Sequence, residues 1–210
     1  MKHLKVLFQG DSITDASRLD TEDGLGYGYP RFAAELLRNS HPELDFEFIN
    51  RGIGGNRLCD LAGRWQEDCI DLQPDVVSVL IGVNDCLKYY LNPKSYLQDN
   101  EFEEMYREIL QTAREKTKAK IIVLEPFTVD HGTFNQLFYD DLCRKIRVTR
   151  RLAAELADAF VPLDGIFAES VVGPDVWPDM FSGDCIHPFE TGHRLIAGHY
   201  MEAFEKIYSK

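Results

Sequence analysis

The chain is short of positive charge. It has 23 Lys and Arg residues against 35 Asp and Glu, which gives a formal net charge of −12 at pH 7. Nucleic acids and anionic membrane surfaces are bound through basic groups that displace counterions. The composition therefore argues against nucleic acid and against a membrane as partners.

Long apolar runs and paired cysteines are also missing. No run approaches the ~18–20 apolar residues of a membrane-spanning helix. The opening stretch MKHLKVLFQGDS has an apolar run of about five residues, below the ~7–15 of a secretory signal. The five cysteines are odd in number and include no C-x-x-C pair, which is typical of reduced thiols rather than disulfides or a zinc site. We expect a cytoplasmic protein.

What is present is an alternation of short apolar runs and longer helical patterns. Continuously apolar runs indicate strands that are covered on both faces, and their alternation with helices predicts a parallel sheet between two helical layers. The length of 210 residues suits one domain, residues 1–210. The expected strands are residues 4–8, 46–49, 76–81, 120–125 and 159–164, and the expected helices are 29–38, 101–116, 135–156 and 190–207.

Short polar motifs follow the predicted strands. In open parallel sheets the ligand site lies beyond the carboxyl ends of the strands, so these motifs are expected to meet at one edge. They are GDS (10–12), NRGIGGN (50–56), GVND (82–85) and EPF (125–127), and DCIHP (184–188) precedes the last helix.

Ser12 in GDS is the first candidate for chemistry. A single Ser after a strand is usually only a helix cap, but a neighbouring imidazole would make its hydroxyl a nucleophile. Among the six histidines, His187 is expected in a loop because it precedes Pro188. Asp184 lies three residues earlier, where its carboxylate can orient the imidazole. These residues predict a Ser-His-Asp arrangement.

Two further motifs can supply hydrogen-bond donors to a developing oxyanion. The glycines of GIGG allow the backbone to approach a ligand closely, and Asn84 offers a side-chain amide. Together with the Ser12 N–H, they would form an oxyanion hole. Taken singly, a Gly-Gly pair is more often a plain turn and Asn-Asp more often a helix cap.

In order and spacing, these motifs resemble the four blocks of the SGNH (GDSL-type) hydrolases, from residue 10 to residue 188. The resemblance implies a flavodoxin-like α/β/α sandwich with about five mostly parallel strands and no metal or organic cofactor. It implies Ser12 as nucleophile, His187 as base and Asp184 as its orienter. The oxyanion donors would be the Ser12 N–H, Asn84 and Gly55, with Gly54 as the alternative glycine.

Longer stretches, among them RWQEDCIDLQPDVVSVLIGVND and DCIHPFETGHRLIA, resemble the intracellular acetylxylan esterase branch. The resemblance implies a short-chain acyl ester as substrate, with acetyl on a sugar hydroxyl as the expected case, and it allows a homo-oligomer. Ser182 and Gly183 stand before Asp184, where an aromatic residue is expected in that branch.

Aromatic side chains near the motifs are candidates for a sugar platform, although core packing is the more usual role of each. The candidate substrate contacts are Asp11, Tyr27 and Trp177. Further aromatic candidates are Tyr29, Trp65 and Phe181.

Three other functions remain open from the sequence. A lysophospholipase or thioesterase would use the same catalytic residues on a longer acyl chain. A binding protein with the same fold would have lost the chemistry. A metal hydrolase would use Asp184, His187 and Glu190, but Pro188 interrupts the helical face that this spacing needs.

Overall fold

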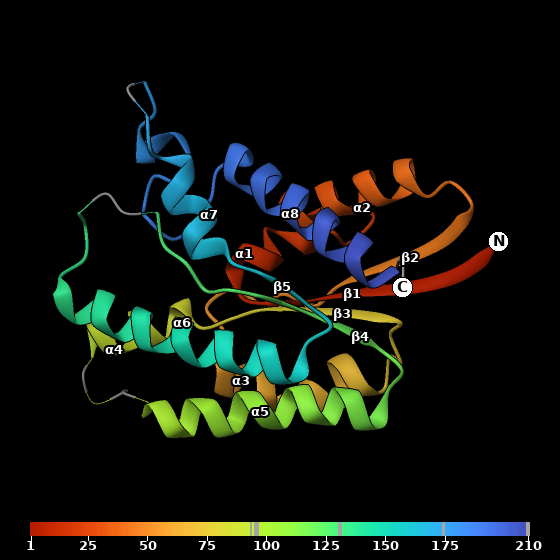
Figure 1. Cartoon of the computed structure of the whole chain (residues 1–210), viewed down its shortest axis with the longest axis horizontal. Coiled ribbons are helices and arrows are strands. Elements are labelled where there is room, and N and C mark those ends of the chain that lie inside the picture. Colours follow the sequence, from red (N-terminus) through yellow and green to blue (C-terminus); the bar gives the residue numbers. More distant parts are fainter. Residues whose placement is uncertain (93, 95–96, 130–131, 174, 209–210) are drawn as a thin grey trace.

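Five parallel strands form the centre of the molecule, between two layers of helices (Figure 1). The computed structural model describes residues 1–92, 94, 97–129, 132–173 and 175–208. The strand order is β2-β1-β3-β4-β5. The strands are β1 (Lys2–Gly10), β2 (Leu44–Asn50), β3 (Val76–Leu80), β4 (Lys120–Leu124) and β5 (Ala159–Val161). The predicted α/β/α sandwich is confirmed.

Four long helices cover the sheet where helical periodicity predicts them. They are α2 (Tyr29–Ser40), α5 (Asp99–Lys116), α6 (Gln136–Leu156) and α8 (Glu190–Tyr208). Apolar side chains recur at three- and four-residue spacing in these segments, so each helix has one face that it can bury.

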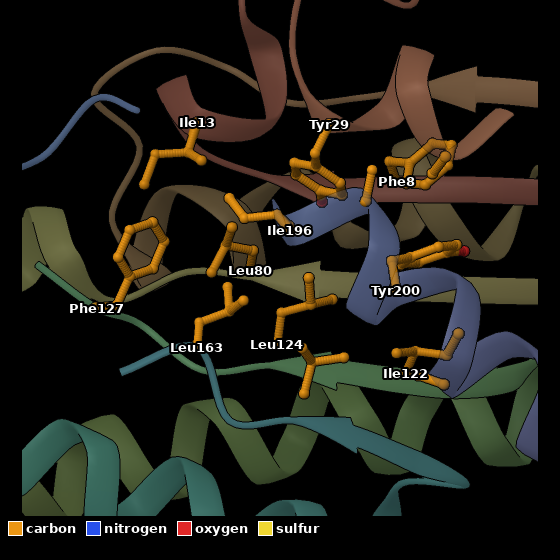
Figure 2. Close-up of a cluster of buried hydrophobic side chains, with 14 of the residues drawn as sticks. Phe8, Ile13, Tyr29, Leu80, Ile122, Leu124, Phe127, Leu163, Ile196 and Tyr200 are labelled. Atoms are coloured by element: carbon orange, nitrogen blue, oxygen red, sulfur yellow. The ribbon is translucent and has the colours of Figure 1, made fainter. Parts of the chain in front are cut away.

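Alternate residues of each strand face opposite layers, which divides the core in two. Val6 and Phe8 of β1 pack with α2 and α8, whereas Leu7 packs with α3 (Leu58–Gly63) and α5. Figure 2 shows the first of these cores, where Phe8, Tyr29 and Tyr200 lie between the sheet and the helices above it. Because both faces are covered, β3 is buried along its whole length.

Helical periodicity does not predict several short elements. Three short helices follow strands at their carboxyl ends, namely α1 (Ser12–Asp15), α4 (Val83–Leu91) and α7 (Leu163–Ser170), and short helical turns lie at Arg18–Asp20, Gln66–Ile70 and Pro178–Met180. The strand expected at 159–164 ends at Val161, because Pro162 leaves the extended conformation and α7 begins at Leu163.

Parallel pairing brings the ends of β1 and β3 side by side. Gly10 pairs with Leu80. The helices that follow these two strands, α1 from Ser12 and α4 from Val83, therefore begin next to each other at the same edge of the sheet. Among the described residues, no helix combines the length and the apolar composition that crossing a bilayer requires.

Candidate active site

Ser12 is the first residue of α1, directly after the end of β1. Its Oγ lies 2.8 Å from His187 Nε2, although 175 residues separate the two in sequence. Asp11 caps the helix, since its Oδ1 accepts a hydrogen bond from the Ile13 N–H at 3.0 Å. The Ser12 hydroxyl therefore takes no part in capping and is directed at the imidazole.

Asp184 holds the other side of the imidazole. Its Oδ2 lies 2.6 Å from His187 Nδ1, and its Oδ1 accepts from the backbone N–H of Ile186 and of His187. Burial alone would raise the pKa of Asp184, but the hydrogen bonds from His187 and the two amides outweigh it and lower the pKa to about 2. With the carboxylate ionised, Nδ1 carries the hydrogen and Nε2 accepts from Ser12.

The loop that carries Asp184 and His187 has an unusual backbone that is held from outside. Cys185 has a φ of 69°, which is uncommon for a residue with a side chain. Its carbonyl oxygen accepts from the Val129 N–H at 2.9 Å and from the Thr128 hydroxyl at 2.7 Å. The segment after β4 thus fixes the loop through the Cys185 carbonyl. The His187 side chain stays about half exposed.

The glycine loop, residues 51–57, lies beside the nucleophile. A Cβ built on Gly54 would lie 3.9 Å from the Cβ of Ser12. The Gly54 N–H donates to Asp15 Oδ2 at 3.1 Å, whereas the Gly55 N–H has no acceptor within the described residues. Gly55 has a φ of 76°, where a residue without Cβ is favoured.

Asn84 lies at the start of α4 and contacts the same loop. Its Nδ2 donates to the backbone oxygen of Asn56 at 3.1 Å. The next residue, Asp85, is buried and accepts from the Leu58 N–H at 3.1 Å. Burial raises the pKa of Asp85 to about 7. Two successive residues of α4 therefore hold the end of the glycine loop.

The predicted substrate contacts differ in placement. Asp11 is only 1% exposed and caps α1, so its position does not fit a direct contact with substrate. Tyr27 and Trp177 are both more than half exposed. The Tyr27 N–H donates to Ala16 at the end of α1, which places this residue next to the nucleophile helix, whereas the contact of Trp177 with substrate stays a prediction.

The other aromatic candidates also divide by burial. Tyr29 and Trp65 are buried core residues, so they do not offer a face to a sugar. Phe181 is partly buried and packs edge-on against Phe167. Core packing, the more usual role, thus applies to these three side chains.

Sequence reasoning missed the residues that hold the site together. Asp15, Arg64 and Thr128 each bind a backbone group of a catalytic segment. The only sequence signal is their position, since Asp15 lies one helical turn after Ser12 and Arg64 begins the stretch RWQEDCIDLQPDVVSVLIGVND, which resembles the acetylxylan esterase branch. Within the described ranges, no three His, Cys, Asp or Glu side chains are grouped so that they could hold a metal ion.

Comparison with known proteins gives matches over nearly the whole chain. Residues 8–195 match the model of the GDSL-like lipase/acylhydrolase family. An acetylxylan esterase of Geobacillus stearothermophilus is 32% identical over 98% of this chain and 97% of its own length. A crystal structure of that organism's acetylxylan esterase superposes with a TM-score of 0.85 at 31% identity, covering 99% of this chain and 97% of that one.

A second solved structure is similar to the same extent. It is an alpha/beta hydrolase enzyme from the metagenome of Lake Arreo, Spain, with a TM-score of 0.87 and 27% identity, covering 97% of this chain and 96% of that one. The family match spans far more than half of the chain, and the similarity in structure covers both partners almost completely. The chain therefore belongs to the GDSL-like lipase/acylhydrolase family and is a carboxylic ester hydrolase.

Proposed function

We propose that this protein is a serine esterase that removes short acyl groups, acetyl in the first place, from carbohydrate hydroxyls. One observation carries the proposal: the continuous chain of hydrogen bonds from Ser12 Oγ through the His187 imidazole to Asp184, with distances of 2.8 and 2.6 Å. This is the arrangement that makes a serine hydroxyl nucleophilic.

In the acylation step, Ser12 Oγ attacks the ester carbonyl carbon while His187 Nε2 takes the hydroxyl proton. The Asp184 carboxylate stabilises the imidazolium that forms. The carbonyl oxygen becomes an oxyanion, which the Ser12 N–H, the Gly55 N–H and Asn84 Nδ2 bind. Donors that are already in place lower the barrier because they need no rearrangement as the charge develops.

Acylation is completed when the imidazolium gives its proton to the sugar oxygen and the alcohol departs, which leaves the acyl group on Ser12 Oγ. Water then enters, His187 removes one of its protons, and the hydroxide attacks the acyl carbon. Collapse of this second tetrahedral intermediate releases the carboxylic acid and returns the proton to Ser12 Oγ. His187 thus acts as base and then as acid in each half.

The choice of Gly55 over Gly54 rests on the loop's hydrogen bonds. The Gly54 N–H already donates to Asp15 Oδ2 at 3.1 Å, so it would have to break this bond to reach an oxyanion. The Gly55 N–H has no such competitor within the described residues. Its left-handed backbone, with φ at 76°, also turns the amide differently from an extended residue.

The substrate class is supported by the relatives and by the openness of the site. The similar proteins include acetylxylan esterases, and the side chains of His187 and Asp184 are 54% and 55% exposed, which suits a bulky sugar. Tyr27 and Trp177 would provide aromatic faces for the sugar rings.

A lysophospholipase or thioesterase would need an apolar groove for its chain at the nucleophile. An apolar cavity of about 290 Å³ lies between α6 and α7, but its lining includes neither Ser12 nor His187. No observation in the structure favours this alternative. An inactive binding protein is disfavoured too, because Ser12 and His187 are within hydrogen-bonding distance.

The test is a substrate panel that measures acid release from peracetylated xylose, acetylated xylo-oligosaccharides, and octanoyl and palmitoyl esters. We expect fast acetate release from the sugars and slow release of the longer acids, with Ser12→Ala inactive on all of them. Preference for the palmitoyl ester would reject the proposed substrate class. Equal rates for wild type and Ser12→Ala would reject the serine mechanism.

A further inference from the structure

Arg64 lies directly after α3 and contacts the glycine loop. Its side chain is 15% exposed, so a charged group is mostly withdrawn from water. Such burial is costly unless every N–H finds a partner. The partners of the Arg64 guanidinium therefore indicate what the residue is for.

The guanidinium binds both ends of the glycine loop. Nη1 donates to the Arg51 carbonyl oxygen at 2.8 Å, and Nε donates to Asn56 Oδ1 at 2.9 Å. Gly54 and Gly55 lie between these two anchor points. A planar, rigid group that bridges the ends of a short loop fixes the span of that loop.

The same guanidinium also binds the strand that leads to the nucleophile. Nη2 donates to the Gly10 carbonyl oxygen at 3.2 Å, and Nη1 lies 3.0 Å from the side-chain oxygen of Gln9. Gly10 is two residues before Ser12. One side chain thus connects the backbone before the nucleophile with the loop that carries the glycine amides.

The charge of Arg64 is neutralised locally. Asp68 Oδ2 lies 2.9 Å from Nη1, and the Gln9 side chain donates to the Asp68 carbonyl oxygen at 2.7 Å. Each of the three guanidinium nitrogens therefore donates to an acceptor of the protein itself. The arrangement suits a structural brace and does not suit a group that binds an anionic substrate.

We propose that Arg64 is a positioning residue for ester hydrolysis, which sets the distance between the glycine-loop amides and Ser12. The inference rests on the proposed function, because the amides matter only if an oxyanion forms there. Arg64 does not touch substrate. It acts through Arg51, Asn56 and Gly10, and its loss lets the loop move relative to the nucleophile.

The first variant is Arg64→Lys, which keeps the positive charge opposite Asp68. A lysine ammonium is a point donor and cannot span Arg51, Asn56 and Gly10 at once. We expect kcat for 4-nitrophenyl acetate to fall about 10²-fold, the effect of a displacement of about 1 Å in a catalytic group. KM should change by less than about threefold, because the lost interaction serves the transition state.

The second variant, Asn56→Ala, removes only the side-chain acceptor for Nε and keeps the Asn56 carbonyl that binds Asn84. Loss of one such hydrogen bond should lower kcat by roughly three- to tenfold. The matched control is Arg114→Lys. Arg114 donates to the Leu156 carbonyl oxygen at 2.8 Å, but it lies near the amino end of β4, far from the site, and kcat should not change.

Backbone hydrogen exchange gives a readout that does not depend on activity. In Arg64→Lys, amides of residues 51–57 should exchange faster than in wild type while those of β3 stay protected. If wild type shows no Ser12-dependent hydrolysis, the proposed function fails and the exchange result still decides whether Arg64 holds the loop.

Two results would overturn the inference. One is a folded Arg64→Lys protein with wild-type kcat and unchanged exchange in residues 51–57. The other is a change in KM alone, which would indicate that Arg64 contacts substrate. If Arg64→Lys does not fold, Asn56→Ala carries the test, and a wild-type kcat in that variant would overturn the inference.

Discussion

Asp15 accepts a hydrogen bond from the backbone amide of Gly54, with 3.1 Å between Oδ2 and N, across 39 residues of sequence. Asp15 lies one turn after Ser12 in the same short helix. The helix that carries the nucleophile therefore also holds the loop that would bind the oxyanion. Arg18 supports this contact, since its Nε donates to the Gly52 carbonyl oxygen at 2.7 Å.

Replacing Asp15 by Ala should lower kcat by roughly tenfold, because one hydrogen bond that positions the glycine loop is lost. Asp15→Asn is the matched control, since its side-chain oxygen can still accept from the Gly54 N–H, and it should recover most of the rate. Steady-state kinetics on 4-nitrophenyl acetate measures both. Wild-type kcat in Asp15→Ala would show that the contact has no catalytic consequence.

Gly10→Ala tests why a glycine precedes the nucleophile. Gly10 belongs to β1 and is needed for space, because a Cβ there would lie 2.2 Å from Thr14 Oγ1 and 2.5 Å from the Leu80 carbonyl oxygen. We expect a loss of about 1–3 kcal/mol in the free energy of unfolding, measured in urea.

The control for this substitution is Gly198→Ala in α8, where a Cβ meets nothing within 4 Å. That change should stabilise the protein by about 0.5–1 kcal/mol, since Ala is the better helix former. If both alanines had the same effect on stability, the close approach at Gly10 would not be the reason for the glycine.

Asn84→Ala removes one proposed oxyanion donor. We expect kcat to fall by roughly 10²–10³-fold, while the loss of the contact with Asn56 changes stability by only about 1 kcal/mol. Asn100→Ala, on the exposed face of α5, should leave kcat unaltered. If Asn84→Ala folds and its kcat falls by less than tenfold, Asn84 is not an oxyanion donor.

Asp11 makes stability depend on pH. Burial raises the pKa of Asp11 to about 7, well above the value of about 3.9 in an unfolded chain. Below pH ~4 the carboxyl is protonated in both states. As pH rises toward 7, the unfolded chain ionises first, so the stability that this group contributes is progressively lost and is gone above the folded pKa.

The free energy of unfolding of Asp11→Asn, measured relative to wild type, should therefore be higher at pH 8 than at pH 4.5. The expected change in this difference is on the order of 1–3 kcal/mol. The side-chain oxygen of Asn can still cap α1. Asp179→Asn, at an exposed site, serves as control in the same urea titrations. A difference between Asp11→Asn and wild type that is constant with pH would mean that Asp11 titrates normally.

The sheet and the location of the site could be predicted from sequence. Buried parallel strands such as residues 76–80 are apolar except at Ser78, and parallel pairing brings the motifs after them to one edge of the sheet. Ser12 and His187 are 175 residues apart in sequence, and their pairing is predicted from residue type and the order of the motifs, because His187 lies in the loop before α8 and not at the end of a strand. The family match, residues 8–195, spans all of these motifs.

The supporting contacts could not be predicted in the same way. Arg64 reaches the Gly10 carbonyl across 54 residues, and which backbone oxygens it finds depends on how the segment after α3 packs. The sequence predicts Asp11 as a substrate contact, whereas in the structure Asp11 is buried and caps α1. Side-chain to backbone bonds between distant segments leave no periodic signal in a sequence.

The most direct test of the account is to find where the acyl group goes. Wild-type protein is mixed with 4-nitrophenyl acetate, quenched with acid within the first turnover, digested and mapped by mass spectrometry, with Ser12→Ala treated in parallel. The account predicts acetyl on the peptide that contains Ser12 in wild type, no acetyl there in Ser12→Ala, and turnover of that variant near the uncatalysed rate. Wild-type turnover by Ser12→Ala, or acetyl found only on another residue, would contradict it.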